Sequence, residues 1–430
     1  MIIKRTHLAN NSNISYWGIL ILGIALMFSC QEKEFNTFAP TGSGMPNTGI
    51  LDILQRGSFE TDAFITEWTV PKDSLIAFTL DTNRQYNCII DWGDNSDLTM
   101  IFHKSDYYRA QHKYAATATY RIKILGIFPQ LNIQENCKPY LYQIIQWGNV
   151  SFQTLALAFF KCENLYSIAA GIPNLESYSS TFSHCTGLMT LPDGLFSNCT
   201  KSKSFPMTFS NCTNLKSLPP RLFKDCYNAE NFAVTFQNTG LISLPQGLFE
   251  NCSKVTNFTF TFGNCKNLTT LPADLFSYSP NVTSFMRTFS SCNNLYTIPI
   301  SLFDNCKNVT NFSYTFSGCS SLENITIPEN VTTIGSSAFE ESGITGIIIP
   351  KNVTSIEAGD ESGAFLKCDN LSYIQVDKEN TVYDSRDNCN AIIQTEDNSL
   401  LVGSSNTTIP EDVTSIGWEA FYGSGLTNIY

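Results

Sequence analysis

A repeat of about 27 residues constrains this chain of 430 residues more than any other feature of its sequence. A Thr-Phe pair recurs at intervals of 27, 27, 26, 27 and 27 residues, and its phenylalanines are Phe182, Phe209, Phe236, Phe262, Phe289 and Phe316. A Leu-Phe pair, preceded by Leu-Pro or Ile-Pro, lies between successive copies, as in residues 191–196. One unit buries too few apolar side chains to offset the entropy lost on ordering it, so the units must stack. The sequence therefore predicts a mainly β solenoid over residues 159–321, in which each unit forms one rung.

The repeat motif changes after Leu322. An Ile-Pro pair, a Val-Thr-x-Ile segment and an Ala-Phe pair occur in this order within residues 325–339, 347–365 and 409–421. These residues are similar to those of the BspA-like leucine-rich repeats, and the 27-residue region resembles a divergent relative of that family. The resemblance covers residues 159–430 and implies a leucine-rich-repeat solenoid, of which residues 322–430 are the second part. An insertion at residues 372–408 is predicted to add a β-hairpin to the stack.

A smaller β-rich region precedes the repeats. Its clearest predicted strands are residues 74–80, 86–92 and 119–126. The segments Asp91–Ser96, His112–Tyr114 and Tyr120–Ile124 resemble the polycystic-kidney-disease-type (PKD-type) immunoglobulin-like domain, which implies a β-sandwich over residues 50–130. Residues 131–158 are then a connector and the N-terminal cap of the solenoid.

Two aspartates and two histidines of this region are of the residue types found in catalytic and metal sites. Asp91 and Asp94 are predicted to cap a turn through backbone N–H groups, in preference to forming a metal site or an acid pair. His103 and His112 are expected to be lone imidazoles that are either structural or merely exposed.

The N-terminus predicts export. Lys4, Arg5 and His7 precede an uncharged run at residues 17–28, which is too short to span a bilayer and is typical of a signal peptide. The run ends in Ser-Cys, which resembles a lipobox, so residues 1–29 are predicted to be removed and Cys30 to be lipidated. The alternative is an ordinary secretory signal with an incidental cysteine.

The residues after Cys30 extend this prediction. The acidic cluster at residues 31–34 resembles a surface-export tag of Gram-negative lipoproteins. Residues 30–49 are rich in Pro, Gly and Ser and predict a flexible tether. We expect a protein of the outer membrane that is exposed at the cell surface and contacts the membrane through its lipid anchor only.

The cysteines follow the repeat. Eleven of the fifteen lie three residues after a repeat phenylalanine, and these are Cys162, Cys185, Cys199, Cys212, Cys226, Cys252, Cys265, Cys292, Cys306, Cys319 and Cys368. Other repeats place Thr239, Ser279, Ser342 or Ser424 in the same slot. Because these residues cannot form disulfides, the slot predicts a structural ladder of small buried donors with free thiols. Structural disulfides are the main alternative, and Cys88, Cys137 and Cys389 lie outside the slot.

Composition argues against catalysis and nucleic-acid binding. The net charge is −12, whereas nucleic-acid binding depends on neutralising phosphates. Four histidines in the whole chain leave few general bases or zinc ligands. We therefore predict no catalytic residue, no metal and no cofactor.

Two columns of residues vary while the scaffold around them is kept. The first variable column lies two residues before each Thr-Phe phenylalanine and comprises Ser180, Met207, Val234, Phe260, Arg287 and Tyr314. It either packs inward, which its Met, Val and Phe favour, or forms a surface strip, which Arg287 favours. The second variable column follows a repeat leucine, is expected to face solvent, and comprises Met189, Lys216, Ile242, Thr269, Tyr296 and Glu323. An exposed apolar and aromatic strip suits contacts with a protein or a glycan.

The sequence thus predicts a lipid-anchored surface protein that binds or adheres to a host or bacterial protein or glycan through its solenoid. Its resemblance to the BspA-like family implies this role without identifying the ligand. The alternative is a component that captures substrates for a glycan or peptide uptake system. The segment Leu426–Tyr430 stops within a motif, so the last rung is expected either to fray or to pair end to end with another chain.

Overall fold

The computed structural model describes residues 2–3, 60–358 and 362–426. The predicted tether and Cys30 lie outside the described residues, as does the signal peptide apart from Ile2 and Ile3. The chain divides into two compact units, of which unit 1 comprises Met1–Pro129 and Ile145–Gln153 and unit 2 comprises Gln130–Ile144 and Thr154–Tyr430. Within the described ranges no helix has the length and hydropathy of a membrane span.

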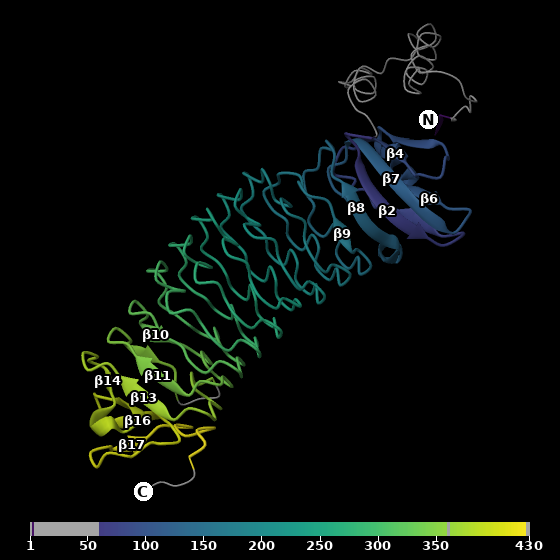
Figure 1. Cartoon of the computed structure of the whole chain (residues 1–430). Coiled ribbons are helices and arrows are strands. Elements are labelled where there is room, and N and C mark those ends of the chain that lie inside the picture. The colour runs from purple at the N-terminus through teal and green to yellow at the C-terminus, as the bar shows by residue number, and fades with distance from the viewer. Residues whose placement is uncertain (1, 4–59, 359–361, 427–430) are drawn as a thin grey trace. The chain divides into compact units, whose positions relative to one another are not determined.

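Unit 1 is built from antiparallel strands (Figure 1). They are β1 (Ile2–Ile3), β2 (Phe64–Val70), β3 (Leu75–Ala77), β4 (Asn87–Asp91), β5 (Leu98–Ile101), β6 (Gln111–Lys113) and β7 (Ala118–Ile127), with the 3₁₀ helix η2 (Lys104–Arg109) after β5. One sheet has the order β1-β5-β4-β7-β2, and β3 pairs with β6 in a second sheet. The strands predicted at residues 74–80, 86–92 and 119–126 correspond to β3, β4 and β7.

The predicted boundary of this region differs from the observed one. Residues 145–153 belong to unit 1, although the sequence assigned them to a connector at residues 131–158. The Trp147 ring stacks on Phe64 with 5.5 Å between ring centroids, and the Asn149 N–H donates to the Asp62 carbonyl at 2.7 Å. This aromatic and backbone pairing holds the segment on unit 1.

Unit 2 is a stack of rungs (Figure 1). Its regular elements are η3 (Glu135–Tyr140), β8 (Leu141–Gln146, whose last two residues belong to unit 1), β9 (Ser167–Ile168), β10 (Thr333–Ile334), β11 (Gly346–Ile349), β12 (Ser355–Ile356), β13 (Tyr373–Val376), β14 (Tyr383–Asp384), η4 (Arg386–Asn388), β15 (Ala391–Gln394), β16 (Ser399–Gly403) and β17 (Ser415–Ile416). Between β9 and β10 the rungs are joined by single parallel β-bridges, such as Ser204 with Asn231 and Asn231 with Asn257. The stacking predicted from the 27-residue period is therefore confirmed.

Backbone hydrogen bonds join neighbouring rungs in two opposite directions. Along the line of β-bridges a rung donates to both neighbours, as from the Glu230 N–H to the Lys203 carbonyl of the preceding rung at 2.8 Å and from the Phe232 N–H to the Asn257 carbonyl of the following rung at 2.9 Å. Along the Thr-Phe turns, each rung donates to the following one, as from the Met207 N–H to the Ala233 carbonyl at 3.1 Å. Every rung is thus bound to its neighbours on more than one side.

The predicted insertion at residues 372–408 does contain a hairpin, because β15 and β16 pair in antiparallel fashion. One part of that prediction is wrong. Strand β13 pairs in parallel with β11, in register from Gly346 opposite Tyr373, and so continues the solenoid ladder. The inserted residues therefore begin after β13.

Phenylalanine rings fill the interior of the rungs. The rings of the Thr-Phe column stack along the solenoid with centroid distances between 5.3 Å at Phe159–Phe182 and 5.9 Å at Phe262–Phe289. A second column packs against it, as at Phe196–Phe209 with 6.2 Å between centroids. These rings are buried, so each rung covers the apolar face of the next.

Candidate binding surface

The threonine of each Thr-Phe pair is a buried donor between rungs. The Thr235 hydroxyl lies 2.8 Å from the Phe205 carbonyl of the preceding rung and 2.6 Å from the Phe232 carbonyl of its own rung. Thr208, Thr261, Thr288 and Thr315 make the corresponding contacts with the preceding rung. These hydroxyls satisfy carbonyl groups that would otherwise be buried without a partner.

The slot cysteines have the same role. The eleven cysteines of the slot are buried free thiols. The Cys212 thiol donates to the Phe182 carbonyl at 3.1 Å, and the Cys292 thiol donates to the Phe262 carbonyl at 3.2 Å. Ser279 occupies the slot in another rung and its hydroxyl donates to the Cys252 carbonyl at 3.4 Å. A hydroxyl and a thiol are thus interchangeable here as small donors.

Burial keeps these thiols protonated. It raises the pKa of Cys212 and of Cys319 to about 12, and the pKa of Cys265 to about 11. Because the thiolate is the nucleophile and the metal ligand, a buried neutral thiol supports neither chemistry. Across residues 60–358 and 362–426, no three His, Cys, Asp or Glu side chains gather in a way that could hold a metal ion.

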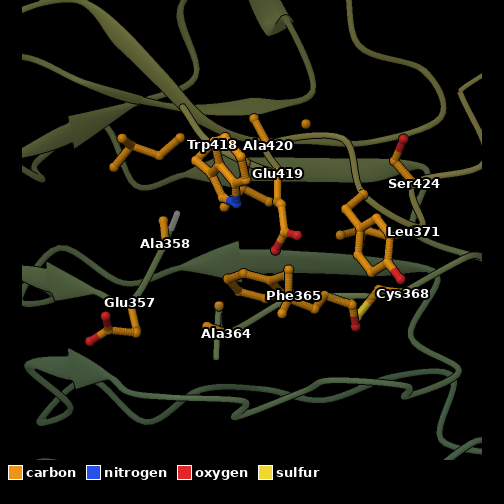
Figure 2. Close-up of a pocket in the computed structure, with 16 residues that line it drawn as sticks. Glu357, Ala358, Ala364, Phe365, Cys368, Leu371, Trp418, Glu419, Ala420 and Ser424 are labelled. Atoms are coloured by element: carbon orange, nitrogen blue, oxygen red, sulfur yellow. The ribbon is translucent and has the colours of Figure 1, made fainter. Parts of the chain in front are cut away.

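Two hollows near the C-terminal end of unit 2 are candidates for a small-molecule site. Figure 2 shows one of them, with the Trp418 ring on one side and the Phe365 ring on the other. Its volume is about 20 Å³, which holds one water, whereas small-molecule sites start near ~300 Å³. The other, of about 370 Å³, is lined by polar groups, and its Lys367 is paired with Glu341 at 2.7 Å. Neither hollow combines apolar walls with convergent polar groups, which small-molecule sites require.

The second variable column is solvent-facing. Met189, Ile242 and Tyr296 are 61%, 49% and 53% exposed, Lys216 and Glu323 are exposed, and Thr269 is half-buried. Its backbone is a continuous ladder, in which the Thr269 N–H donates to the Ile242 carbonyl at 3.0 Å. The column therefore presents side chains from a regular backbone, and its binding role stays a prediction.

The first variable column also lies at the surface for most of its length. Met207 is 46% exposed, Arg287 is exposed, and Val234, Phe260 and Tyr314 are half-buried. The inward interpretation is correct only for Ser180, which is 9% exposed. Inward packing fails because these residues occupy a turn, whose interior is already filled by the following Thr-Phe pair.

All six residues of the first variable column have a left-handed backbone, with φ between 52° at Ser180 and 62° at Val234. This conformation costs a residue with a Cβ atom about 1–2 kcal/mol, and it favours Gly and Asn. Bulky and β-branched residues are therefore the least suited to it. These residue types do not indicate a left-handed backbone, so the conformation could not be predicted at these positions.

The same rungs contain another left-handed column with the expected residues. It lies two residues after each Thr-Phe phenylalanine and comprises His184, Asn211, Asn238, Asn264, Ser291 and Gly318. In the other half of the rungs, left-handed positions hold Gly171, Gly194, Gly247, Asn198 and Asn251, with Arg221 as the exception. Backbone geometry explains these residues, and it does not explain the Met, Val, Phe, Arg and Tyr of the first variable column.

Side chains of neighbouring rungs touch within the first variable column. The Arg287 guanidinium lies over the Tyr314 ring, 4.5 Å from its centroid. The Ser180 hydroxyl lies 3.7 Å from the Met207 sulfur. The Phe260 ring folds over Gly263, where an added Cβ would come within 1.9 Å of the ring. Side chains of the column thus contact each other between rungs at Ser180–Met207 and at Arg287–Tyr314.

Unit 1 corrects one expectation about its histidines. Asp91 and Asp94 do cap the turn, since their Oδ1 atoms accept the N–H groups of Gly93 and Ser96 at 3.0 Å each. His112, however, is not a lone imidazole, because its Nε2 lies 2.7 Å from Asp94 Oδ2. The two residues are 18 positions apart, which hid the pair from the sequence.

The surroundings of this pair are structural. The His112 ring stacks on Trp92 with 5.4 Å between centroids. Burial alone would raise the pKa of Asp94, but hydrogen bonds from Ser96 and His112 outweigh it and lower the pKa below its ordinary value. The carboxylate therefore stays ionised and holds the turn to β6.

Comparison with known families and structures assigns the repeat. The family model described as the BspA type leucine rich repeat region matches residues 174–310, 312–395 and 401–430, in six copies. These ranges cover more than half of the chain. No curated protein matches the chain.

Several solved structures are similar to this chain. A leucine-rich repeat protein from Bacteroides ovatus ATCC 8483 is 19% identical, with 70% of this chain and 76% of that chain covered and a TM-score of 0.42. A leucine rich cell surface protein from Faecalibacterium prausnitzii A2-165 is 19% identical, with 66% and 55% covered and a TM-score of 0.23. The family match decides the assignment: this chain belongs to the BspA-type leucine-rich repeat family.

Proposed function

We propose that this chain is a cell-surface binding or adhesion protein that recognises a protein or glycan of a host or bacterial surface through its solenoid. The main support is the pair of variable columns, which place exposed, changing side chains on a fixed backbone. Proteins of the BspA-type family are generally surface-associated, which fits this role. The interior supports it too, because neutral buried thiols and hydroxyls stabilise the stack without supplying reactive groups.

The proposal includes a lipid anchor at Cys30 and a spacer. Unit 1 would be a PKD-type immunoglobulin-like spacer between the tether and the solenoid. The turn held by Asp91 and Asp94, with His112 and Tyr114 against it, supports this, because these are the residues that carry the resemblance.

The anchor is tested by labelling cells with an alkyne fatty acid. Cells of a Gram-negative host that express the wild-type chain are expected to give a labelled protein that is accessible to external protease. The variant Cys30→Ser should lose the label. Labelling that persists in this variant would disprove the anchor at Cys30.

The binding role is tested with the full chain on a glycan array and on a panel of matrix proteins. Saturable binding to at least one member is expected. Binding should weaken in variants of the variable columns and survive in a matched variant elsewhere, such as Lys201→Ala. Recognition confined to short oligosaccharides or peptides would favour capture for uptake over adhesion, and no binding to any member would contradict the proposal.

Self-association at the last rung is a further part of the proposal. Ile416 is 50% exposed, whereas Ile334 and Ile356 occupy the equivalent position of earlier rungs and are 0% and 8% exposed. A second copy that stacks on this rung would cover Ile416 and Trp418, which is 72% exposed. Light scattering should then show a dimer that Ile416→Glu converts to a monomer, and a monomeric wild-type chain at high concentration would contradict it.

A further inference from the structure

The first variable column carries more information than its exposure alone. Left-handed positions elsewhere in the rungs hold mostly Asn and Gly, as at Asn238 and Gly194. Single exceptions such as Arg221 and Lys367 occur elsewhere, whereas the first variable column holds bulky apolar residues in successive rungs, at Met207, Val234 and Phe260. Strain that persists at such positions clusters at binding sites, because the side chain is kept for what it contacts.

We propose that the first variable column is a docking strip for an amphipathic α-helix of a partner protein, laid along the solenoid axis with about one helical turn per rung. This inference rests on the proposed binding function and specifies its surface and partner class. The central part of the strip comprises the column residues from Met207 to Tyr314.

The composition of the strip favours a protein over a glycan. Met207 is 46% exposed, Val234 and Phe260 add half-buried apolar surface, and Met286, which directly precedes Arg287 and lies outside the column, is 39% exposed. Met, Arg and aromatic residues are the types enriched in protein interfaces. The first variable column supplies few of the polar groups that a sugar needs, because its hydroxyls are those of Ser180 and Tyr314.

The spacing of the rungs favours a helix over an extended segment. The phenylalanines two residues after the strip repeat at 5.6, 5.8, 5.9 and 5.8 Å from Phe209 to Phe316. An α-helix repeats every ~5.4 Å, whereas an extended strand repeats one face every ~6.7 Å. Apolar side chains at positions i, i+4, i+7 and i+11 of a helix therefore stay in register over several rungs, and those of a strand do not.

Arg287 defines the charge of the partner at one position. Its guanidinium lies over the Tyr314 ring, 4.5 Å from the centroid, and the side chain is exposed, so its N–H groups are available to a ligand. In the described part of the chain, no ion pair is formed by Arg287. The chain as a whole is acidic, with a net charge of −12. An acidic residue of the helix is therefore expected opposite Arg287 and disfavoured along most of the remaining surface.

The test uses two displayed peptide libraries of equal size, selected on the full chain. One presents helices of about 20 residues randomised at i, i+4, i+7 and i+11, and the other presents extended peptides randomised at alternate positions. We expect binders from the helical library. Their affinity should fall about tenfold or more for Met207→Ala combined with Phe260→Ala, and should be nearly unchanged for the matched control Tyr227→Ala combined with Ile300→Ala, which are exposed apolar residues outside both variable columns.

A charge exchange sharpens the test. Replacing the acidic residue of a selected helix by Lys should weaken its binding to the wild-type chain, and Arg287→Glu should restore it. Binders drawn only from the extended library, no binders from either library, or helical binders sensitive to Ile242 and Tyr296 instead would each overturn the inference. The proposed binding function would survive such a result if the full chain still bound a member of the glycan or matrix panel.

Discussion

Unit 1 and the solenoid stabilise buried polar groups in different ways. Unit 1 uses a charged contact between residues distant in sequence, Asp94 and His112, next to a stacked Trp92. The solenoid uses neutral donors, such as Thr235 and Cys212, which bond to the adjacent rung. A compact unit can therefore depend on one specific pair, whereas a repeated one needs a donor that can recur at every rung without accumulating charge.

The two units should differ most in their response to pH. Burial raises the pKa of the slot thiols above the usual value near 9, to about 12 for Cys212, so their contribution is complete below pH 9 and is lost as the pH rises toward 12. Each such thiol contributes about 1.4 kcal/mol per pH unit in that range. The solenoid should unfold at alkaline pH before unit 1, as followed by hydrogen exchange with mass spectrometry.

At acidic pH we expect the opposite order, with unit 1 losing stability before the solenoid. The pKa of Asp94 is lowered in the folded unit 1, so its contribution is complete above about pH 4 and is lost as the pH falls below that value. The variant Asp94→Asn should remove this part of the acid dependence from unit 1 and leave the solenoid unchanged. Equal loss of hydrogen-exchange protection in both units, at alkaline and at acidic pH, would contradict both predictions.

A cavity in the phenylalanine column tests how local the solenoid's stability is. Phe209 is fully buried and stacks between Phe182 at 5.5 Å and Phe236 at 5.6 Å. Phe209→Ala should cost about 3–5 kcal/mol. Denaturant unfolding and hydrogen exchange should place the loss in the neighbouring rungs and not in unit 1. The control Met207→Ala changes an exposed residue two positions before Phe209 and should lower the free energy of unfolding only slightly.

The threonine ladder offers a matched pair of variants. The Thr235 hydroxyl contacts two carbonyl groups, so Thr235→Val should cost about 1–3 kcal/mol. The Thr181 hydroxyl is equally buried and has no hydrogen-bond partner among the described residues, so Thr181→Val should be close to neutral. Similar losses for both, measured by chemical denaturation, would show that the methyl packing and not the hydrogen bond stabilises the ladder.

The left-handed columns give the smallest expected effect. Val234→Asn should stabilise the chain by about 1 kcal/mol, because asparagine tolerates a φ of 62° better than valine. The reverse change Asn238→Val, at a φ of 55°, should destabilise it by about 1–2 kcal/mol. Thermal unfolding of both variants checks this. Destabilisation by Val234→Asn would mean that packing within the strip, and not contact with a partner, accounts for the valine.

The stack could be predicted from the sequence because each of its features recurs. The period fixed the position of Phe209 and its equivalents, and serine at Ser279 in the cysteine slot argued for a donor in place of a disulfide. Because the rungs repeat, the residues at one position can be compared between rungs. A position that holds Cys in some rungs and Ser in others indicates a small hydrogen-bond donor.

Features that occur once, or that oppose local preference, could not be predicted. The pairing of His112 with Asp94 depends on strands brought together only by folding. The left-handed turn at Val234 was hidden because valine is the wrong residue for it, although the regular asparagines at Asn211 and Asn238 mark the same turn. The sequence therefore identified the first variable column but not its left-handed backbone, because its side chains oppose the backbone preference.

The opposite directions of the inter-rung hydrogen bonds have an electrostatic consequence. In an α-helix all peptide dipoles add, and a longer helix carries opposite partial charges at its ends. Here the Glu230 N–H points toward one end of the solenoid and the Met207 N–H toward the other, so their dipoles oppose each other. A stack of this kind therefore builds up a weaker field along its axis with each added rung than it would if all of its inter-rung bonds pointed the same way.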